Sequence, residues 1–207
     1  SALAAARHPE RGFNVVYHEF AHKLDMSSGG MDGTPPLADQ AQLDAYLGGT
    51  RLTPDDAYRF AKGEEMEVNG EKVKIDRPLD FAAVTDHAEY LGEMYSTMFP
   101  EAPGHDNDDL VQLREMTDLD ERQQWFIKYV VSSNRSATPQ HPPFFAGPAT
   151  AKSAWQVIVD AAEEANDPGT FTAMIGFEWS AAPNGANLHR NVLFRDNNVP
   201  VSVPSYV

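Results

Sequence analysis

Residues 79–87 have the sequence Leu-Asp-Phe-Ala-Ala-Val-Thr-Asp-His, a short apolar run that ends in polar side chains. Its length, and the Pro78 that precedes it, are typical of a mostly buried strand. A second run, Phe-Thr-Ala-Met-Ile-Gly-Phe-Glu-Trp at 171–179, also predicts a buried strand, and a carboxylate lies near its end. Helical patterns precede both runs. This repeated order of helix, strand and polar end predicts an α/β fold.

A helix is expected from Thr53-Pro54-Asp55-Asp56 onward. The threonine can cap the first turn, proline suits the first helical position, and the two aspartates complement the helix dipole. Ala57, Phe60 and Ala61 would form its buried side. An exposed hairpin is then predicted over 66–75, because alternating apolar residues flank Asn69-Gly70, a strong turn signal.

The amphipathic pattern is clearest over 151–166, where Trp155, Ile158, Val159 and Ala162 share one helical face. The other predicted elements are helices over 13–25, 89–99 and 110–133, with a break near Asp118 in the last, and a short strand over 191–195. A proline-rich loop is expected over 138–148.

Composition limits the classes of function. The 207 residues include no cysteine, so a metal could be held only by nitrogen and oxygen ligands. The formal net charge of −15 argues against a nucleic-acid partner. The sequence has no apolar run of the roughly 20 residues that span a bilayer, and its start does not resemble a signal peptide. We therefore expect a cytoplasmic protein with a small-molecule or peptide substrate and no membrane partner; the oligomeric state is not predicted.

One motif with clear chemical meaning is His18-Glu19-Phe20-Ala21-His22. Two histidines four residues apart on a helix project from the same face, where both can bind one zinc ion. Glu19 is then placed to act as the general base that takes a proton from a water held by the zinc.

The segments 12–26 and 32–37 around this motif resemble zinc peptidases of the Mlc-titration-factor-A type, and the likeness covers residues 1–43. The resemblance implies that His18 and His22 bind zinc and that Glu19 is the base. The third ligand of that family is a glutamate on a later helix. Thr85-Asp-His-Ala-Glu89 is loosely similar to the segment that carries it, so Glu89, or His87 at the family's proline position, would complete the coordination.

A second group of candidate residues lies at predicted strand ends: Asp86 and His87 after one strand, and Glu178 near the end of another. His189 follows in the next loop. Because the carboxyl ends of strands in parallel α/β sheets carry the chemistry, these side chains could share a metal. From spacing alone, an ordinary hydrogen-bonding role for each histidine is the alternative.

The segments 52–62, 79–93, 177–180 and 187–196 resemble the domain-of-unknown-function 3604 family, and the likeness covers residues 44–207. That family is related to the polymerase and histidinol phosphatase (PHP) metallophosphoesterases, which have a distorted seven-stranded barrel and up to three metals. The resemblance implies that His87 and His189 are metal ligands and that Glu178 is a bridging carboxylate.

The sequence departs from that family at both ends. The opening histidine-x-histidine motif should precede residue 44, where the peptidase-like segment stands, and the closing aspartate-x-histidine motif would lie beyond Val207. The prediction is a partial PHP-like (β/α) barrel over 44–207, preceded over 1–43 by a zincin-type helix.

Other charged residues have weaker signals. His105 and His141 lie in polar or proline-rich segments and are expected to be solvated. Arg190 and Arg195 could contact a substrate phosphate or pair with surface carboxylates.

The function expected from these features is metal-dependent hydrolysis through a zinc-activated water, of the phosphoesterase type. Zn²⁺ is the expected metal, and other divalent metals are possible at the PHP-like site. One alternative is a zinc peptidase that uses His18, Glu19 and His22. Another is a non-catalytic fragment or fusion whose metal site is incomplete.

Overall fold

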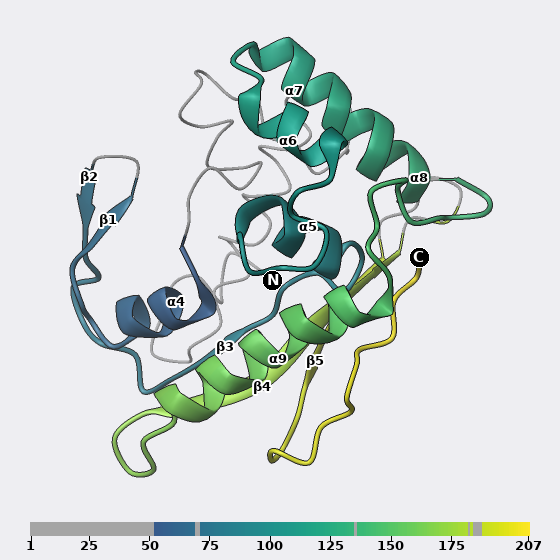
Figure 1. Ribbon diagram of the computed structural model, residues 1–207. Helices are drawn as coiled ribbons and strands as arrows, with labels where there is room; N and C mark the ends of the chain where they lie inside the picture. The colour runs from purple at the N-terminus through teal and green to yellow at the C-terminus, as the bar shows by residue number, and fades with distance from the viewer. Residues whose placement is uncertain (1–51, 69–70, 135, 182, 184–187) are drawn as a thin grey trace, which may run out of the picture.

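The computed structural model describes residues 52–68, 71–134, 136–181, 183 and 188–207. Strands β3 (Phe81–Val84), β4 (Thr172–Ala181) and β5 (Leu188–Leu193) form one sheet in that order. β3 is parallel to β4, and β5 is antiparallel to β4. The mixed α/β class is therefore confirmed. In the described part of the chain the sheet is open and does not close into a barrel (Figure 1).

The described helices are α4 (Pro54–Ala61), α5 (Leu91–Met98), α6 (Asp108–Glu115), α7 (Leu119–Phe126), α8 (Ser132–Asn134) and α9 (Pro148–Ala165). A π-helical stretch, η2 (Ile127–Val131), joins α7 to α8. The predicted break near Asp118 is confirmed, because Met116 has an extended backbone and Asp118 Oδ1 accepts the N–H of Glu121 in the first turn of α7. No helix in the described ranges is long and apolar enough to cross a bilayer.

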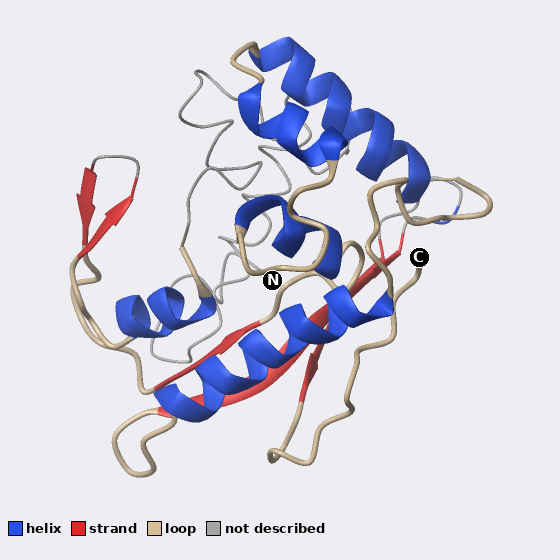
Figure 2. Cartoon of the chain, in the orientation of Figure 1, coloured by secondary structure: helices blue, strands red, loops and turns tan. Residues whose placement is uncertain are grey.

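The predicted hairpin is also present. β1 (Met66–Val68) and β2 (Glu71–Val73) pair as antiparallel strands, with Met66 opposite Val73. Figure 2 shows this hairpin beyond α4, apart from the three-stranded sheet. The turn residues, 69–70, lie outside the described residues.

Helix α4 begins as its sequence predicts, with a capping box in which Thr53 and Asp56 bond each other's backbone N–H. Its predicted buried side is partly wrong, because Ala57 is exposed and Tyr58 is buried beside Ala61. The phenol explains the difference. Tyr58 Oη donates to the carbonyl of Met174 and accepts the N–H of Val84, each at 3.2 Å, so it bridges β3 and β4.

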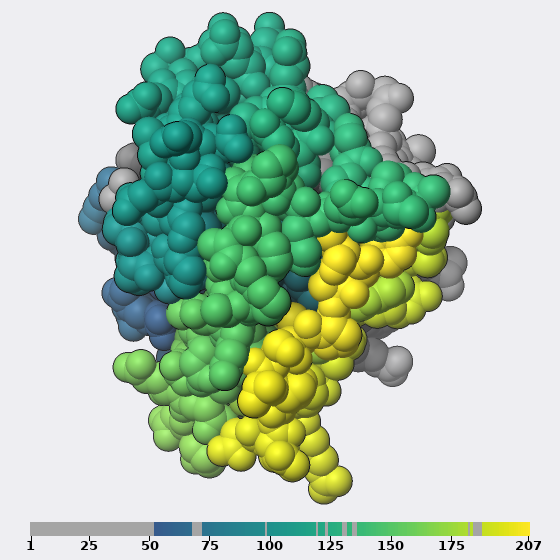
Figure 3. Space-filling model, turned by 45° about the vertical axis from the view of Figure 1, so that its right-hand side comes forward, coloured from purple at the N-terminus to yellow at the C-terminus, as the bar shows by residue number. Residues whose placement is uncertain are grey.

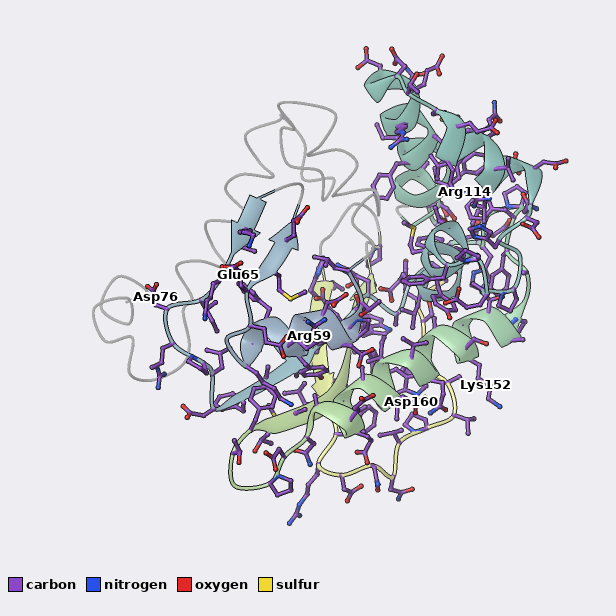
Figure 4. All side chains as sticks on the ribbon, turned by 60° about the vertical axis from the view of Figure 1, so that its left-hand side comes forward. Arg59, Glu65, Asp76, Arg114, Lys152 and Asp160 are labelled. Carbon is purple, nitrogen blue, oxygen red and sulfur yellow. The ribbon has the colours of Figure 1, made fainter. Side chains whose placement is uncertain are left out.

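The main core lies between α9 and one face of the sheet. The four predicted inward residues of α9 are buried, and Trp155 is 1 % exposed with its ring edge-on to Phe177. Lys152 and Asp160 lie on the exposed side of the same helix (Figure 4).

The C-terminal segment runs beside α9 (Figure 3), and Trp155 Nε1 donates to the carbonyl of Pro200 at 2.8 Å. Helix α5 packs on the start of α9 so closely that a Cβ on Gly92 would lie 2.6 Å from the backbone nitrogen of Ala151. These contacts hold α5 and the C-terminal segment on α9.

Strand β3 is less buried than its sequence predicts. Ala82 and Val84 pack against the core below α9, but Phe81 is 54 % exposed. Side chains alternate along a strand, so Phe81 lies on the opposite face of the sheet. The apolar run predicts a strand buried on both faces, whereas the structure buries mainly the face that carries Ala82 and Val84.

Trp155→Ala should lower the free energy of unfolding by about 3–5 kcal/mol, because it leaves a cavity between α9 and the sheet and removes the bond to Pro200. Urea denaturation measures the change. The matched control is Lys152→Ala on the exposed side of the same helix, which should change stability by about 0.5 kcal/mol or less. Equal effects of the two substitutions would contradict the described core.

Candidate metal centre

The register of the sheet places four polar side chains on one face. Ser180 of β4 lies opposite His189 of β5, and a parallel bridge pairs His87 with Glu178. Residues that are directly opposite each other share a face, as do residues two apart in a strand. Phe177 precedes Glu178 in β4 and so lies on the other face, where it is buried in the core with α9. The four polar residues therefore lie on the face away from α9.

Two backbone hydrogen bonds position His87, which follows the end of β3. The N–H of Glu178 donates to the carbonyl of Asp86 at 2.9 Å, and the N–H of Ala88 donates to the carbonyl of Glu178 at 2.8 Å. These bonds extend the pairing of β3 and β4 past Val84. They bring the imidazole of His87 beside the carboxylate of Glu178, near the carboxyl ends of two parallel strands.

The side chains of His87, Glu178 and His189 converge. One ligand-type atom from each residue lies within 4.8 Å of those from the other two. His87 Nδ1 is 3.6 Å from Glu178 Oε1, and His189 Nδ1 is hydrogen-bonded to the same oxygen. The two imidazole rings are edge-on, with their centroids 5.3 Å apart. The structure thus brings together three of the predicted metal ligands.

Ser180 belongs to the same cluster, and sequence reasoning gave it no role. Its hydroxyl lies 2.6 Å from His87 Nδ1 and 3.4 Å from His189 Nδ1, and it donates to Glu178 Oε1 at 3.0 Å. The signal that could have found it is its position two residues after Glu178 on a strand, which gives the two side chains the same face.

The cluster shifts the ionisation of its own members. The hydrogen bond to Glu178 raises the pKa of His189 above its usual value, and partial burial opposes that shift. Partial burial raises the pKa of Glu178, but the bonds from His189 and Ser180 and the charge of His87 outweigh it and leave that pKa below its usual value. A carboxylate that stays ionised beside two imidazoles is suited to hold a cation.

Glu89 lies next to the cluster and supports it through the backbone. It is 5 % exposed; Oε2 accepts the N–H of Ser180 at 3.0 Å and Oε1 accepts the N–H of Tyr206 at 3.3 Å. Burial raises its pKa, and these bonds oppose the shift. Its expected role as a third ligand beside His18 and His22 stays a prediction, since both histidines, with Glu19, lie outside the described residues.

The donors of the cluster fit a divalent metal. Two imidazole nitrogens and a carboxylate oxygen are ligands that zinc and other first-row metals accept. The side chain of His87 is 57 % exposed, which leaves one side of the cluster open to solvent. The geometry can therefore hold a cation and still admit a small molecule.

Arg190 and His141 lie outside the cluster. Arg190 is paired with Trp179 in the register and so lies on the face opposite to His189, where its Nη1 donates to the carbonyl of His189. His141 is exposed, as expected, and its Nδ1 in addition lies 2.6 Å from Oε1 of the buried Glu93. This contact between His141 and Glu93 joins the proline-rich loop to α5, and the local sequence does not reveal it.

These features define an α/β protein with a cluster of metal-ligating side chains at the ends of its strands. The sequence matches the family described as "Protein of unknown function (DUF3604)" over residues 37–206, so the chain belongs to this family. No curated protein and no solved structure matches the sequence.

Glu178→Gln should make the metal-free protein less stable by about 1 kcal/mol, and the loss should depend on pH. Stability from the lowered pKa of Glu178 is present above the unfolded value of 4.5 and is lost as pH falls through the folded pKa. Stability from the raised pKa of His189 is present below the unfolded value of 6.5 and is lost as pH rises through the folded pKa. The loss should therefore be largest between these two values.

Urea denaturation in the presence of a chelator, repeated across this pH range, measures the effect. Glu164→Gln, which removes an exposed carboxylate of α9, is the control and should show no such maximum. A loss for Glu178→Gln that is the same at every pH would show that the pair does not exist in solution.

Proposed function

We propose that this protein is a divalent-metal-dependent hydrolase of the PHP-like, phosphoesterase type, with its metal at His87, Glu178 and His189. The observation that carries the proposal is the convergence of these three side chains at the carboxyl ends of β3 and β4. Open α/β sheets bind their ligands outside this edge. The chain belongs to the DUF3604 family, and the resemblance of this family to the PHP enzymes favours phosphoesters as substrates.

The histidines and the glutamate have different roles in this proposal. His87 and His189 each offer a ring-nitrogen lone pair, and Glu178 offers negative charge. A bound metal would supply Lewis acidity toward a phosphoryl oxygen. The proton in the bond between His189 Nδ1 and Glu178 Oε1 has to leave before that nitrogen can bind a cation, so metal affinity should fall in acid.

Charge explains why a phosphoester would need the metal. The chain has a formal net charge of −15, which repels an anionic substrate. Arg190 lies on the opposite face of the sheet and does not offset this charge at the cluster. A divalent cation at His87, Glu178 and His189 would supply local positive charge at the open side of the cluster.

The zinc peptidase is the second candidate, and the observation that favours it is the sequence His18-Glu19-Phe20-Ala21-His22. It predicts peptide hydrolysis that Glu19→Gln abolishes while zinc stays bound. A non-catalytic chain, the third hypothesis, predicts sub-stoichiometric metal and no turnover of either substrate.

Hydrolysis of an aryl phosphate by the full chain distinguishes these candidates. The assay is run with Zn²⁺, Mn²⁺ or Mg²⁺ and again after chelation. We expect metal-dependent turnover that His189→Ala lowers by about 100-fold or more, because one absent ligand costs a metal site much of its affinity. His105→Ala is the matched control and should retain activity, since His105 Nδ1 lies 2.9 Å from the carbonyl of Ser96, outside the cluster.

Turnover of peptides alone, abolished by Glu19→Gln, would replace the phosphoesterase proposal with the peptidase. Phosphoester turnover that survives both chelation and His189→Ala would also contradict it.

A further inference from the structure

The hydroxyl of Ser180 lies at the centre of the candidate cluster. Ser180 Oγ contacts His87 Nδ1, Glu178 Oε1 and His189 Nδ1 at 2.6, 3.0 and 3.4 Å. A hydroxyl that merely oriented one ligand would need a single contact. The hydroxyl of Ser180 contacts all three.

The spacing of these four atoms is close to that of a ligand shell. Metal–ligand bonds of about 2.1 Å in a tetrahedron place neighbouring ligand atoms about 3.4 Å apart. Four of the separations here, from 2.6 Å to 3.6 Å, lie on both sides of this value, and the bond between His189 and Glu178 is shorter. A small outward movement of the side chains would accommodate a cation among them.

The backbone of Ser180 has hydrogen-bonding or pairing partners on both sides of β4. Ser180 is 4 % exposed, its N–H donates to Oε2 of the buried Glu89, and the carboxylate of Glu89 also accepts the N–H of Tyr206. On the β5 side, Ser180 is paired with His189. These backbone contacts fix the position of Ser180 with its hydroxyl directed toward the three donor atoms.

We propose that Ser180 Oγ is the fourth donor of the metal centre, beside His87, Glu178 and His189; this inference rests on the metal centre proposed above. Hydroxyl oxygens bind hard cations such as Mg²⁺, as the serine or threonine of phosphate-binding loops does. A neutral hydroxyl is a weak ligand for a metal ion. The side chain of His87 is exposed, so one side of the cluster is open to solvent. The centre thus keeps room for a substrate on a metal with more than four ligand positions.

Cobalt(II) provides a direct test, because the chain has no cysteine and an introduced thiol would be its only one. We expect the full-length Ser180→Cys protein loaded with Co²⁺ to show a near-ultraviolet sulfur-to-cobalt charge-transfer band. The matched control is Ser153→Cys on α9, where the native hydroxyl bonds the carbonyl of Ala149, and it should show none. The band would show that a side-chain donor at position 180 reaches the bound metal, which a side chain directed away from the metal could not do.

Affinity supplies a second readout. Titration with Co²⁺ should show about tenfold weaker binding for Ser180→Ala and near-native binding for Ser180→Thr, which keeps the hydroxyl. Co²⁺ bound by Ser180→Cys without the band, or bound by Ser180→Ala as tightly as by the wild type, would overturn the role of Ser180 and leave the metal centre standing. A wild-type protein that binds no Co²⁺ would overturn the metal centre itself.

Discussion

The backbone pairing of β4 determines where every side chain of the candidate centre points. On one side β4 pairs with β5, so that Ser180 faces His189, and on the other its ladder extends past β3 to His87. A shift of either pairing by one residue would turn the histidine of that strand to the opposite face, toward the core under α9. The register is specified strongly because that opposite face carries Phe177 and other buried residues. Hydrophobic packing on one side of the sheet thus fixes the chemistry on the other.

The two faces are linked by a short set of polar contacts. Glu89 is buried between the end of β3 and α5 and bonds the backbone of both Ser180 and Tyr206. The ring of Tyr206 is edge-on to Trp179, and Pro200 accepts the indole N–H of Trp155. The C-terminal segment therefore joins the core under α9 to the backbone of the candidate centre. A change in the backbone position of that segment would alter the hydrogen bonds of Glu89 and, through them, the position of Ser180.

Much of the fold could be predicted from the sequence, because its signals are local. The period of α9, the cap at Thr53 and the alternation along the paired strands β1 and β2 each depend on a few neighbouring residues. The burial of Tyr58 was missed because its hydroxyl bonds groups on β3 and β4, a tertiary contact. The residues of the candidate site also fall into those that local sequence indicates and those that only tertiary contacts reveal. His87 and Glu178 were predicted from their positions at strand ends. His189 was predicted in the following loop, although it lies in β5. The contacts of Ser180 and Glu89 depend on the register, which the local sequence does not reveal.

The measurement that tests the central claim most directly is anomalous scattering from crystals grown with a divalent metal. The account predicts a strong peak bounded by His87, Glu178 and His189, at about 2.0–2.3 Å from their nitrogen and oxygen atoms. Loaded crystals with no peak at this place, or with a peak beside His18 and His22 alone, would contradict it.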